Sequence, residues 1–216
     1  MGADGYRRFR VAYVETAKGS GKSPLAAGIG LYGLMADGEA GAEIYAAATK
    51  KDQAMVLFRD AVAMVDHSPE LSARITKSGT GLNVWNLAWL QTRSFFKPIA
   101  SDDGQSGPRP HISLLDELHE HKDAYVIEML KAGQKSRRQA LQLAITNSGT
   151  NKQTVCWDYH EYGAKVSAGS LQDDTFFAFI CSLDEGDDPF KDEKCWYKAN
   201  PSLRFGLPGM RYLREQ

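Results

Sequence analysis

Short apolar runs alternate with longer amphipathic stretches along this chain, and this alternation predicts strands interleaved with helices. The runs with strand character are residues 11–14, 43–48, 111–115, 140–146 and 175–183. Helical stretches are predicted at residues 22–35, 51–65, 124–132 and 151–164. Strands and helices in alternation are typical of an α/β fold with a mostly parallel central sheet flanked by helices.

Two regions depart from this alternation. Residues 74–99 are strand-like and broken by two glycines, and apolar side chains suggest one buried face at Trp85, Leu87, Trp89 and Leu90. Residues 101–110 are rich in Gly, Pro, Ser and Asp, which predicts a mobile loop. Beyond Asp184 the chain becomes acidic and contains proline. We therefore expect one domain over residues 1–183 and a C-terminal extension over residues 184–216.

Composition narrows the functional classes. The 216 residues carry a formal net charge of −1, so DNA contact would require a local basic patch such as residues 7–10 or 131–138. A solvated charged surface is the alternative for each patch. The cysteines Cys156, Cys181 and Cys195 lack zinc-site spacing and indicate free thiols. Without a signal peptide or an apolar run of about 20 residues, the sequence predicts a soluble intracellular protein with no membrane contact.

The segment between the first predicted strand and the first predicted helix carries the strongest motif, Glu-Thr-Ala-Lys-Gly-Ser-Gly-Lys-Ser at residues 15–23. A strand, a glycine-containing turn ending in Gly-Lys-Ser and a helix form the phosphate-binding P-loop, whose N–H groups cradle an anion. The nucleotide-binding candidates are Lys18, Gly19, Ser20, Gly21, Lys22 and Ser23. Lys22 would reach the β- and γ-phosphates, and the Ser23 hydroxyl would bind Mg²⁺. Thr16 stands where the motif usually has its first glycine, and Lys18 either adds a second cation or is solvated.

A second motif supplies acidic groups. The apolar run at residues 111–115 ends in Asp116 and Glu117. Asp116 would hold Mg²⁺, and Glu117 would orient or deprotonate the attacking water. Occurring together with the P-loop, this pair predicts a nucleoside triphosphate hydrolase. The neighbouring His119 and His121 lack the spacing of a helical zinc site, so we do not expect a transition-metal centre.

A third motif follows the next apolar strand, which ends in Thr146, Asn147 and Ser148. Polar side chains at this place can sense the γ-phosphate by hydrogen bonding. The alternative is a simple Asn-Ser-Gly turn.

Several segments, in the same order, resemble the large terminase subunit of tailed bacteriophages. They are the basic residues 6–10 with the degenerate P-loop, the stretch 43–54, the acidic stretch 115–123, the strand end 144–150 and residues 199–203. The resemblance covers essentially the whole chain. It implies a P-loop NTPase of the additional-strand catalytic-Glu type that hydrolyses ATP to drive double-stranded DNA into a capsid.

The resemblance also implies roles and partners. Lys22 and Ser23 match the phosphate and Mg²⁺ ligands, Asp116 the metal-associated acid and Glu117 the catalytic base, while residues 146–148 match the coupling strand end. The implied partners are double-stranded DNA, the small terminase subunit and the portal protein. A homo-oligomeric ring is expected in the full motor, a monomer is possible for this fragment, and the implied location is the host bacterial cytoplasm.

The chain departs from the family pattern at both ends. The adenine-contacting segment that usually precedes the P-loop is missing, and no later carboxylate constellation indicates a nuclease domain. Nuclease activity is therefore not expected, and residues 184–216 would lead towards that absent domain. The family also uses an arginine that stabilises the transferring phosphoryl group, for which Arg109 is a candidate beside Arg93 and Arg138.

Two other functions remain open from the sequence. Asp-Glu-Leu-His at residues 116–119 fits the box of a DExH-type helicase fragment. Alternatively, the chain is a nucleotide-binding assembly module that is inactive as a monomer because it lacks a neighbour's arginine.

Overall fold

The structure is a computed structural model that describes residues 5–100, 107–121, 123–149 and 151–215. Most of the predicted mobile loop at residues 101–110 lies outside the described residues.

One eight-stranded sheet organises the molecule, in the order β3-β4-β5-β2-β6-β7-β1-β8. The strands are β1 (Val11–Glu15), β2 (Glu43–Ala48), β3 (Thr76–Ser78), β4 (Asn86–Trp89), β5 (Ser94–Ala100), β6 (Ile112–Asp116), β7 (Leu141–Thr146) and β8 (Phe176–Ile180). From β5 to β8 all neighbours run parallel, whereas β4 runs antiparallel to both β3 and β5. The expected mostly parallel sheet is confirmed.

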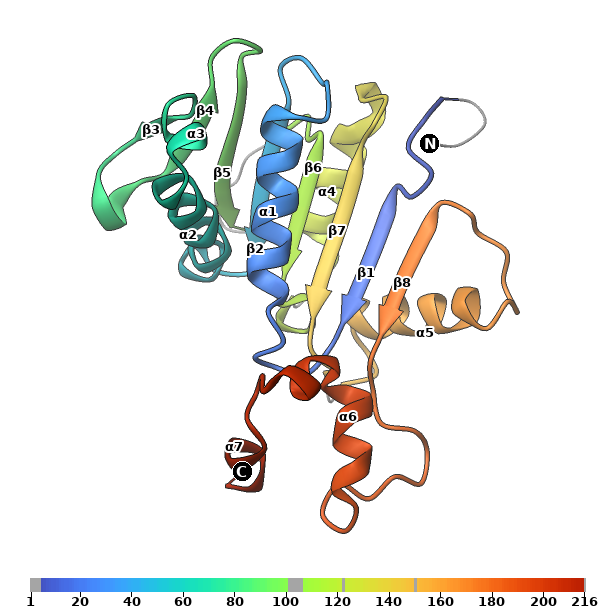
Figure 1. Ribbon diagram of the computed structural model, residues 1–216. Helices are drawn as coiled ribbons and strands as arrows, with labels where there is room; N and C mark the ends of the chain where they lie inside the picture. The colour runs from blue at the N-terminus through green and yellow to red at the C-terminus, as the bar shows by residue number, and fades with distance from the viewer. Residues whose placement is uncertain (1–4, 101–106, 122, 150, 216) are drawn as a thin grey trace.

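Helices cover both faces of this sheet (Figure 1). On one face lie α1 (Lys22–Met35) and α2 (Lys51–His67), and on the other lie α4 (Tyr125–Gly133) and α5 (Val155–Ser167). The shorter helices are α3 (Pro69–Ser72), α6 (Trp196–Ala199) and α7 (Met210–Arg214). Single 3₁₀ turns are η1 (Gly81–Asn83), η3 (Leu118–Glu120), η4 (Gln134–Ser136), η5 (Glu193–Cys195) and η6 (Pro201–Phe205).

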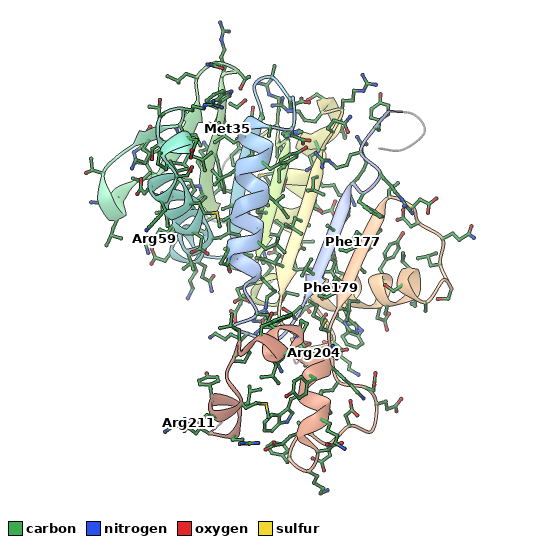
Figure 2. All side chains as sticks on the ribbon, in the orientation of Figure 1. Met35, Arg59, Phe177, Phe179, Arg204 and Arg211 are labelled. Atoms are coloured by element: carbon green, nitrogen blue, oxygen red, sulfur yellow. The ribbon has the colours of Figure 1, made fainter. Side chains whose placement is uncertain are left out.

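The two faces of the sheet form separate apolar cores. On β2, Ile44 and Ala46 pack towards α1 and α2, whereas Tyr45 and Ala47 pack with the residues of α4 and α5. A strand buried on both faces reads as a continuous apolar run, which is why the sequence signal at β2, β6 and β7 is strong. The α1 face is less covered at β8, where Phe177 and Phe179 are 39% and 45% exposed at the sheet edge (Figure 2).

Two local predictions are corrected by the structure. The helix predicted from residue 151 begins at Val155, because Thr154 is its N-cap and accepts a hydrogen bond from the Trp157 N–H. Asn151 instead accepts the Gln153 N–H in the preceding turn. Of the side chains expected on the buried face near β4, Leu87 is fully buried, but Trp85 and Leu90 lie just outside the strand and are exposed.

Residues 184–216 were expected as an extension, and their described part packs against the carboxyl edge of the sheet (Figure 1). Leu203, Cys195 and Asn200 are buried there. The Ala17 N–H of the P-loop donates to the Ala199 carbonyl at 3.0 Å, and Ser202 Oγ donates to the Ser20 carbonyl at 3.4 Å. This segment therefore contacts the turn between β1 and α1.

Candidate functional site

The site lies at the carboxyl edge of the parallel strands, where the loops after β1, β6 and β7 meet. These strands are neighbours in the order β6-β7-β1, so their ends converge although their sequence positions are about 30 to 130 residues apart. Clefts outside the carboxyl ends of parallel strands are the usual place for ligands in open α/β sheets. All three sequence motifs therefore arrive at one edge.

The P-loop connects β1 to α1 through two glycines with left-handed backbone, Gly19 at φ 83° and Gly21 at φ 79°. Only glycine adopts this conformation without strain, so the turn depends on these residues. Gly21 also precedes the first residue of α1, and no side chain caps this helix end among the residues described. The first N–H groups of α1 are therefore available to an anion, and the helix dipole favours one.

The Lys22 side chain folds back over the loop. Its Nζ donates to the Thr16 carbonyl at 2.8 Å, to the Ala17 carbonyl at 3.0 Å and to Thr16 Oγ1 at 3.3 Å. Burial lowers the pKa of Lys22, while the carboxylates of Glu117, Asp116 and Glu15 oppose this shift. The charge of the acidic pair therefore acts on the Lys22 ammonium across the edge of the sheet. Lys18, by contrast, is exposed.

Asp116 ends β6 in a buried position, with 6% of its surface exposed. Burial, followed by the adjacent Glu117 charge, raises its pKa to about 6, and the Glu117 N–H and Lys22 act in the opposite direction. Its Oδ1 accepts the Glu117 N–H at 2.9 Å. A buried carboxylate next to a second one is stabilised by a bound cation, so this position suits a divalent metal.

Glu117 has a left-handed backbone at φ 47°, which is costly for a residue other than glycine. Its side chain is 35% exposed, yet Oε2 is buried and makes no hydrogen bond within the described part of the chain. The nearest recorded cationic or donor atom is His119 Nδ1 at 3.3 Å. This carboxylate is thus held at the edge of the site with one oxygen unpaired.

The end of β7 forms the third part of the site. Thr146 is fully buried, and its hydroxyl donates to the Asn147 carbonyl at 2.9 Å. The Asn147 Oδ1 atom is buried and has no hydrogen bond with any described residue. Ser148 Oγ donates to Glu15 Oε1 at 2.7 Å, so the strand end is tied to the residue that precedes the P-loop.

Glu15 was not singled out by the sequence analysis. It is 2% exposed, and it accepts hydrogen bonds from Tyr13 Oη at 2.6 Å and Ser148 Oγ, with His160 Nδ1 at 2.8 Å from its Oε2. Burial raises the pKa of the Tyr13 hydroxyl well above its ordinary value, and the hydrogen bond to Glu15 raises it further. The sequence did contain a signal for Glu15, because it is a charged residue at the end of an apolar strand, directly before the P-loop. A cavity of about 760 Å³ opens beside it, lined also by Trp157 and His160.

The three arginine candidates lie away from this site. Arg93, Arg109 and Arg138 precede or lie near the starts of β5, β6 and β7, at the amino edge of the sheet. Arg109 is exposed, its N–H donates to Glu43 Oε2 at 2.8 Å, and its Nε lies 3.6 Å from Glu43 Oε1. Since each strand of five to seven residues rises about 3.3 Å per residue, the length of the sheet separates these arginines from the P-loop.

Two features are absent from the residues that the structure describes. No group of three or more His, Cys, Asp or Glu side chains is arranged to hold a metal ion. No described helix is both long and apolar enough to cross a membrane.

Comparison with known proteins gives consistent matches. The family described as "Terminase large subunit, ATPase domain" matches residues 3–165. Protein YmfN of Escherichia coli (strain K12) is 31% identical over 137 residues, a match that covers 62% of this chain and 30% of YmfN.

Solved structures agree. The large terminase of bacteriophage HK97 aligns with a TM-score of 0.82 at 20% identity, covering 96% of this chain and 42% of that one. The large terminase ATPase domain of Thermus phage P74-26 aligns with a TM-score of 0.62 at 19% identity, covering 96% of this chain and 87% of that one. At these identities the structures establish the fold. This chain spans less than half the length of YmfN and of the HK97 terminase.

Proposed function

Since this chain belongs to the terminase large subunit family through its ATPase domain, we propose that it binds ATP with Mg²⁺ at the P-loop and hydrolyses it. In the complete motor, this hydrolysis drives double-stranded DNA into a capsid in the cytoplasm of a bacterial host. The observation that carries the proposal is the meeting of Lys22, Asp116 and Glu117 at one edge of the sheet.

The roles follow from the chemistry of each side chain. The N–H groups of Gly19 to Ser23 and the Lys22 ammonium hold the phosphates. Bound Mg²⁺ neutralises phosphate charge and orients the nucleotide. Ser23 and Asp116 are the residues that would hold it, and the raised pKa of Asp116 marks a carboxyl group that a cation would stabilise. Glu117, with its unpaired Oε2, takes the proton of the attacking water.

Two substitutions separate binding from chemistry. Lys22→Ala removes a charge-assisted contact and should weaken ATP affinity by about 10-fold to 100-fold. Glu117→Gln removes the base but no phosphate ligand, so it should lower turnover by about 10²-fold or more while ATP affinity stays within about twofold. Titration with a fluorescent ATP analogue and a phosphate-release assay measure the two quantities. Wild-type turnover in Glu117→Gln would refute the role of the base.

The location of the arginines favours activation by a neighbouring copy. Because these three candidates lie at the edge opposite the P-loop of their own chain, any of them would have to complete the site of a neighbouring subunit, and Arg109 is our candidate. Turnover per subunit should then rise with protein concentration. An inactive Arg109→Ala protein should regain hydrolysis when mixed with a Lys22→Ala protein, whereas equal turnover at all concentrations would contradict this arrangement. An isolated monomer would bind nucleotide with little chemistry, as the assembly-module alternative requires.

A basic cleft at the amino edge is our candidate for contact with DNA. It has a volume of about 600 Å³ and joins the two basic segments of the sequence, with Arg10 from one and Lys131, Lys135 and Arg138 from the other. No carboxylate in the described part of the chain forms an ion pair with these four side chains. The guanidinium groups of Arg10 and Arg138 lie 5.8 Å and 5.1 Å from the Tyr6 ring. Exposed cations without acidic partners suit the phosphates of a duplex.

Salt dependence tests this contact. The double variant Lys131→Gln/Lys135→Gln should weaken binding to a duplex and reduce the slope of log K against log salt by about 1 to 2. Lys191→Gln is the control, because Lys191 is exposed and already paired with Asp188. An unchanged slope in the double variant would exclude this cleft. Strand separation of a tailed duplex by the protein would instead favour the helicase alternative, which the family match does not favour.

The remaining parts of the proposal concern the longer protein. Residues 184–216 would connect the domain over residues 1–183 to a nuclease domain, and their contacts with the P-loop at Ala17 and Ser20 support a role in relaying its state. The small terminase subunit and the portal protein are the expected partners of the assembled motor, as a ring of several copies. Co-purification of the full-length subunit with each partner tests these contacts.

A further inference from the structure

The His119 imidazole lies between the proposed base and the end of β7. Its Nδ1 is 3.0 Å from Thr146 Oγ1 and 3.3 Å from Glu117 Oε2, and its main-chain N–H donates to Thr146 Oγ1 at 3.2 Å. The ring is largely buried, with 21% of the side chain exposed. One side chain therefore touches two of the three motifs that form the site.

The Thr146 hydroxyl connects this ring to the end of β7. It has one proton, and the acceptors around it are the Asn147 carbonyl at 2.9 Å, His119 Nδ1 at 3.0 Å and Cys156 Sγ at 3.8 Å. Its oxygen already accepts the main-chain N–H of His119. When the hydroxyl proton points to the Asn147 carbonyl, the same oxygen accepts from a protonated Nδ1, and that N–H also faces Glu117 Oε2, which has no hydrogen bond of good geometry within the described residues.

Packing fixes the position of the ring. A Cβ atom added at Gly149 would approach His119 Cβ to 3.2 Å, so the loop after β7 closes against this side chain. The Nε2 atom faces outwards, 3.4 Å from the exposed Glu120. Glu117, in contrast, has a partly exposed side chain whose Oε2 makes no hydrogen bond within the described residues, so fewer contacts hold its carboxylate than hold the ring.

We propose that His119 is a positioning residue for Glu117, an inference that rests on the proposed ATP hydrolysis. The Nδ1–H, held by Thr146, restricts where the carboxylate lies, and thereby sets it for the water that attacks the γ-phosphate. Since Thr146 ends the strand between β6 and β1, a shift of that strand end when nucleotide binds would move His119 and the carboxylate with it. The histidine thus links the γ-phosphate-sensing strand to the base.

Isosteric substitutions test the role of Nδ1. Asparagine places its amide nitrogen near the position of Nδ1, whereas glutamine places it near Nε2. His119→Asn should keep turnover within about threefold of wild type, and His119→Gln and His119→Ala should lower kcat by about 10-fold to 100-fold. Nucleotide affinity should stay within about twofold in all three, because the contacts recorded for His119 are to Glu117, Glu120 and Thr146. His67→Gln, at the exposed end of α2, is the control.

The Glu117→Gln background gives the second comparison. If His119 acts through Glu117, His119→Ala should not reduce the residual turnover of Glu117→Gln any further. Equal loss in His119→Asn and His119→Gln, wild-type kcat in His119→Ala, or an additive loss in the double variant would each overturn the proposal. Thermal unfolding of each variant identifies any that fails to fold.

A measurement without nucleotide separates this inference from the proposed function. Nitrogen NMR of the imidazole should show His119 protonated at Nδ1, with a resonance that shifts in Glu117→Gln and in Thr146→Val. A ring protonated only at Nε2, or unaffected by both substitutions, would refute the role of His119 even if the protein hydrolyses ATP. If the wild-type chain bound no ATP, the proposed function would fail, and the His119 inference with it.

Discussion

Replacing Asp116 by asparagine should stabilise the protein while it removes the proposed metal ligand. Asp116 is buried, and its neighbour Glu117 carries a second negative charge. Asparagine has nearly the same shape, and its Oδ1 can still accept the Glu117 N–H that Asp116 accepts at 2.9 Å. The substitution therefore removes the buried charge without creating a cavity.

The pKa of Asp116 gives the magnitude. Burial and the Glu117 charge raise this pKa from 3.8 to about 6, a difference worth about 3 kcal/mol. Because the folded-state pKa is the higher one, the folded protein holds a proton that the unfolded chain has released. Ionised Asp116 thus opposes folding above about pH 6, and the penalty disappears below about pH 4. The increase in the free energy of unfolding caused by Asp116→Asn should grow from about 1.5 kcal/mol at pH 5 to about 3 kcal/mol at pH 8.

Urea unfolding of both proteins at several pH values, in EDTA and without nucleotide, measures this difference. Glu120→Gln is the control, because Glu120 is an exposed carboxylate in the same segment and its loss should change stability by less than about 0.5 kcal/mol. Phosphate release by Asp116→Asn should fall below detection. A variant that is equally or less stable than wild type at pH 8, or a gain that does not vary with pH, would refute the reasoning.

Further predictions concern packing and the C-terminal segment. A Cβ atom at Gly30 would lie 2.7 Å from the buried Phe96 ring, so Gly30→Ala should destabilise the fold by about 1 to 3 kcal/mol, whereas Gly28→Ala on the same helix meets no atom within 4 Å and should stabilise it by up to about 1 kcal/mol. Thermal unfolding of the pair measures both, and equal midpoints would contradict this packing. Leu203→Ala removes a buried anchor of the segment beyond residue 184, so proteolysis there should accelerate by about 10-fold or more while the sheet resists cleavage. Unchanged cleavage would show that Leu203 does not anchor the segment.

The sequence determined the elements and the chemistry that they carry. The P-loop strand and helix, β2, β6 and β7 were predicted at or within one residue of their observed bounds, because doubly buried strands are continuously apolar and the helices are periodic or rich in Ala and Leu. The family resemblance rests on the same residues and is confirmed by the family match. The predicted start of α5 was wrong. Thr154 and Asn151 can both begin a helix or a turn, and only the local geometry shows that Thr154 caps the helix while Asn151 forms the preceding turn.

Only the tertiary structure decided which side chains meet. A glutamate is usually exposed to solvent, yet the pairing of β1 with β7 and β8 buries Glu15 against Ser148 and His160. From the sequence, His119 is a member of the Asp-Glu-Leu-His box and is not expected to bind a metal, and its contact with Thr146 bridges 27 residues of sequence. Arg109 precedes the acidic strand by a few residues, but a strand carries its two ends to opposite edges of the sheet, so the arginine lies at the edge opposite its own P-loop. Apolar periodicity records which faces are buried, whereas the partners of a polar group depend on strand order, which emerges only when the chain is folded.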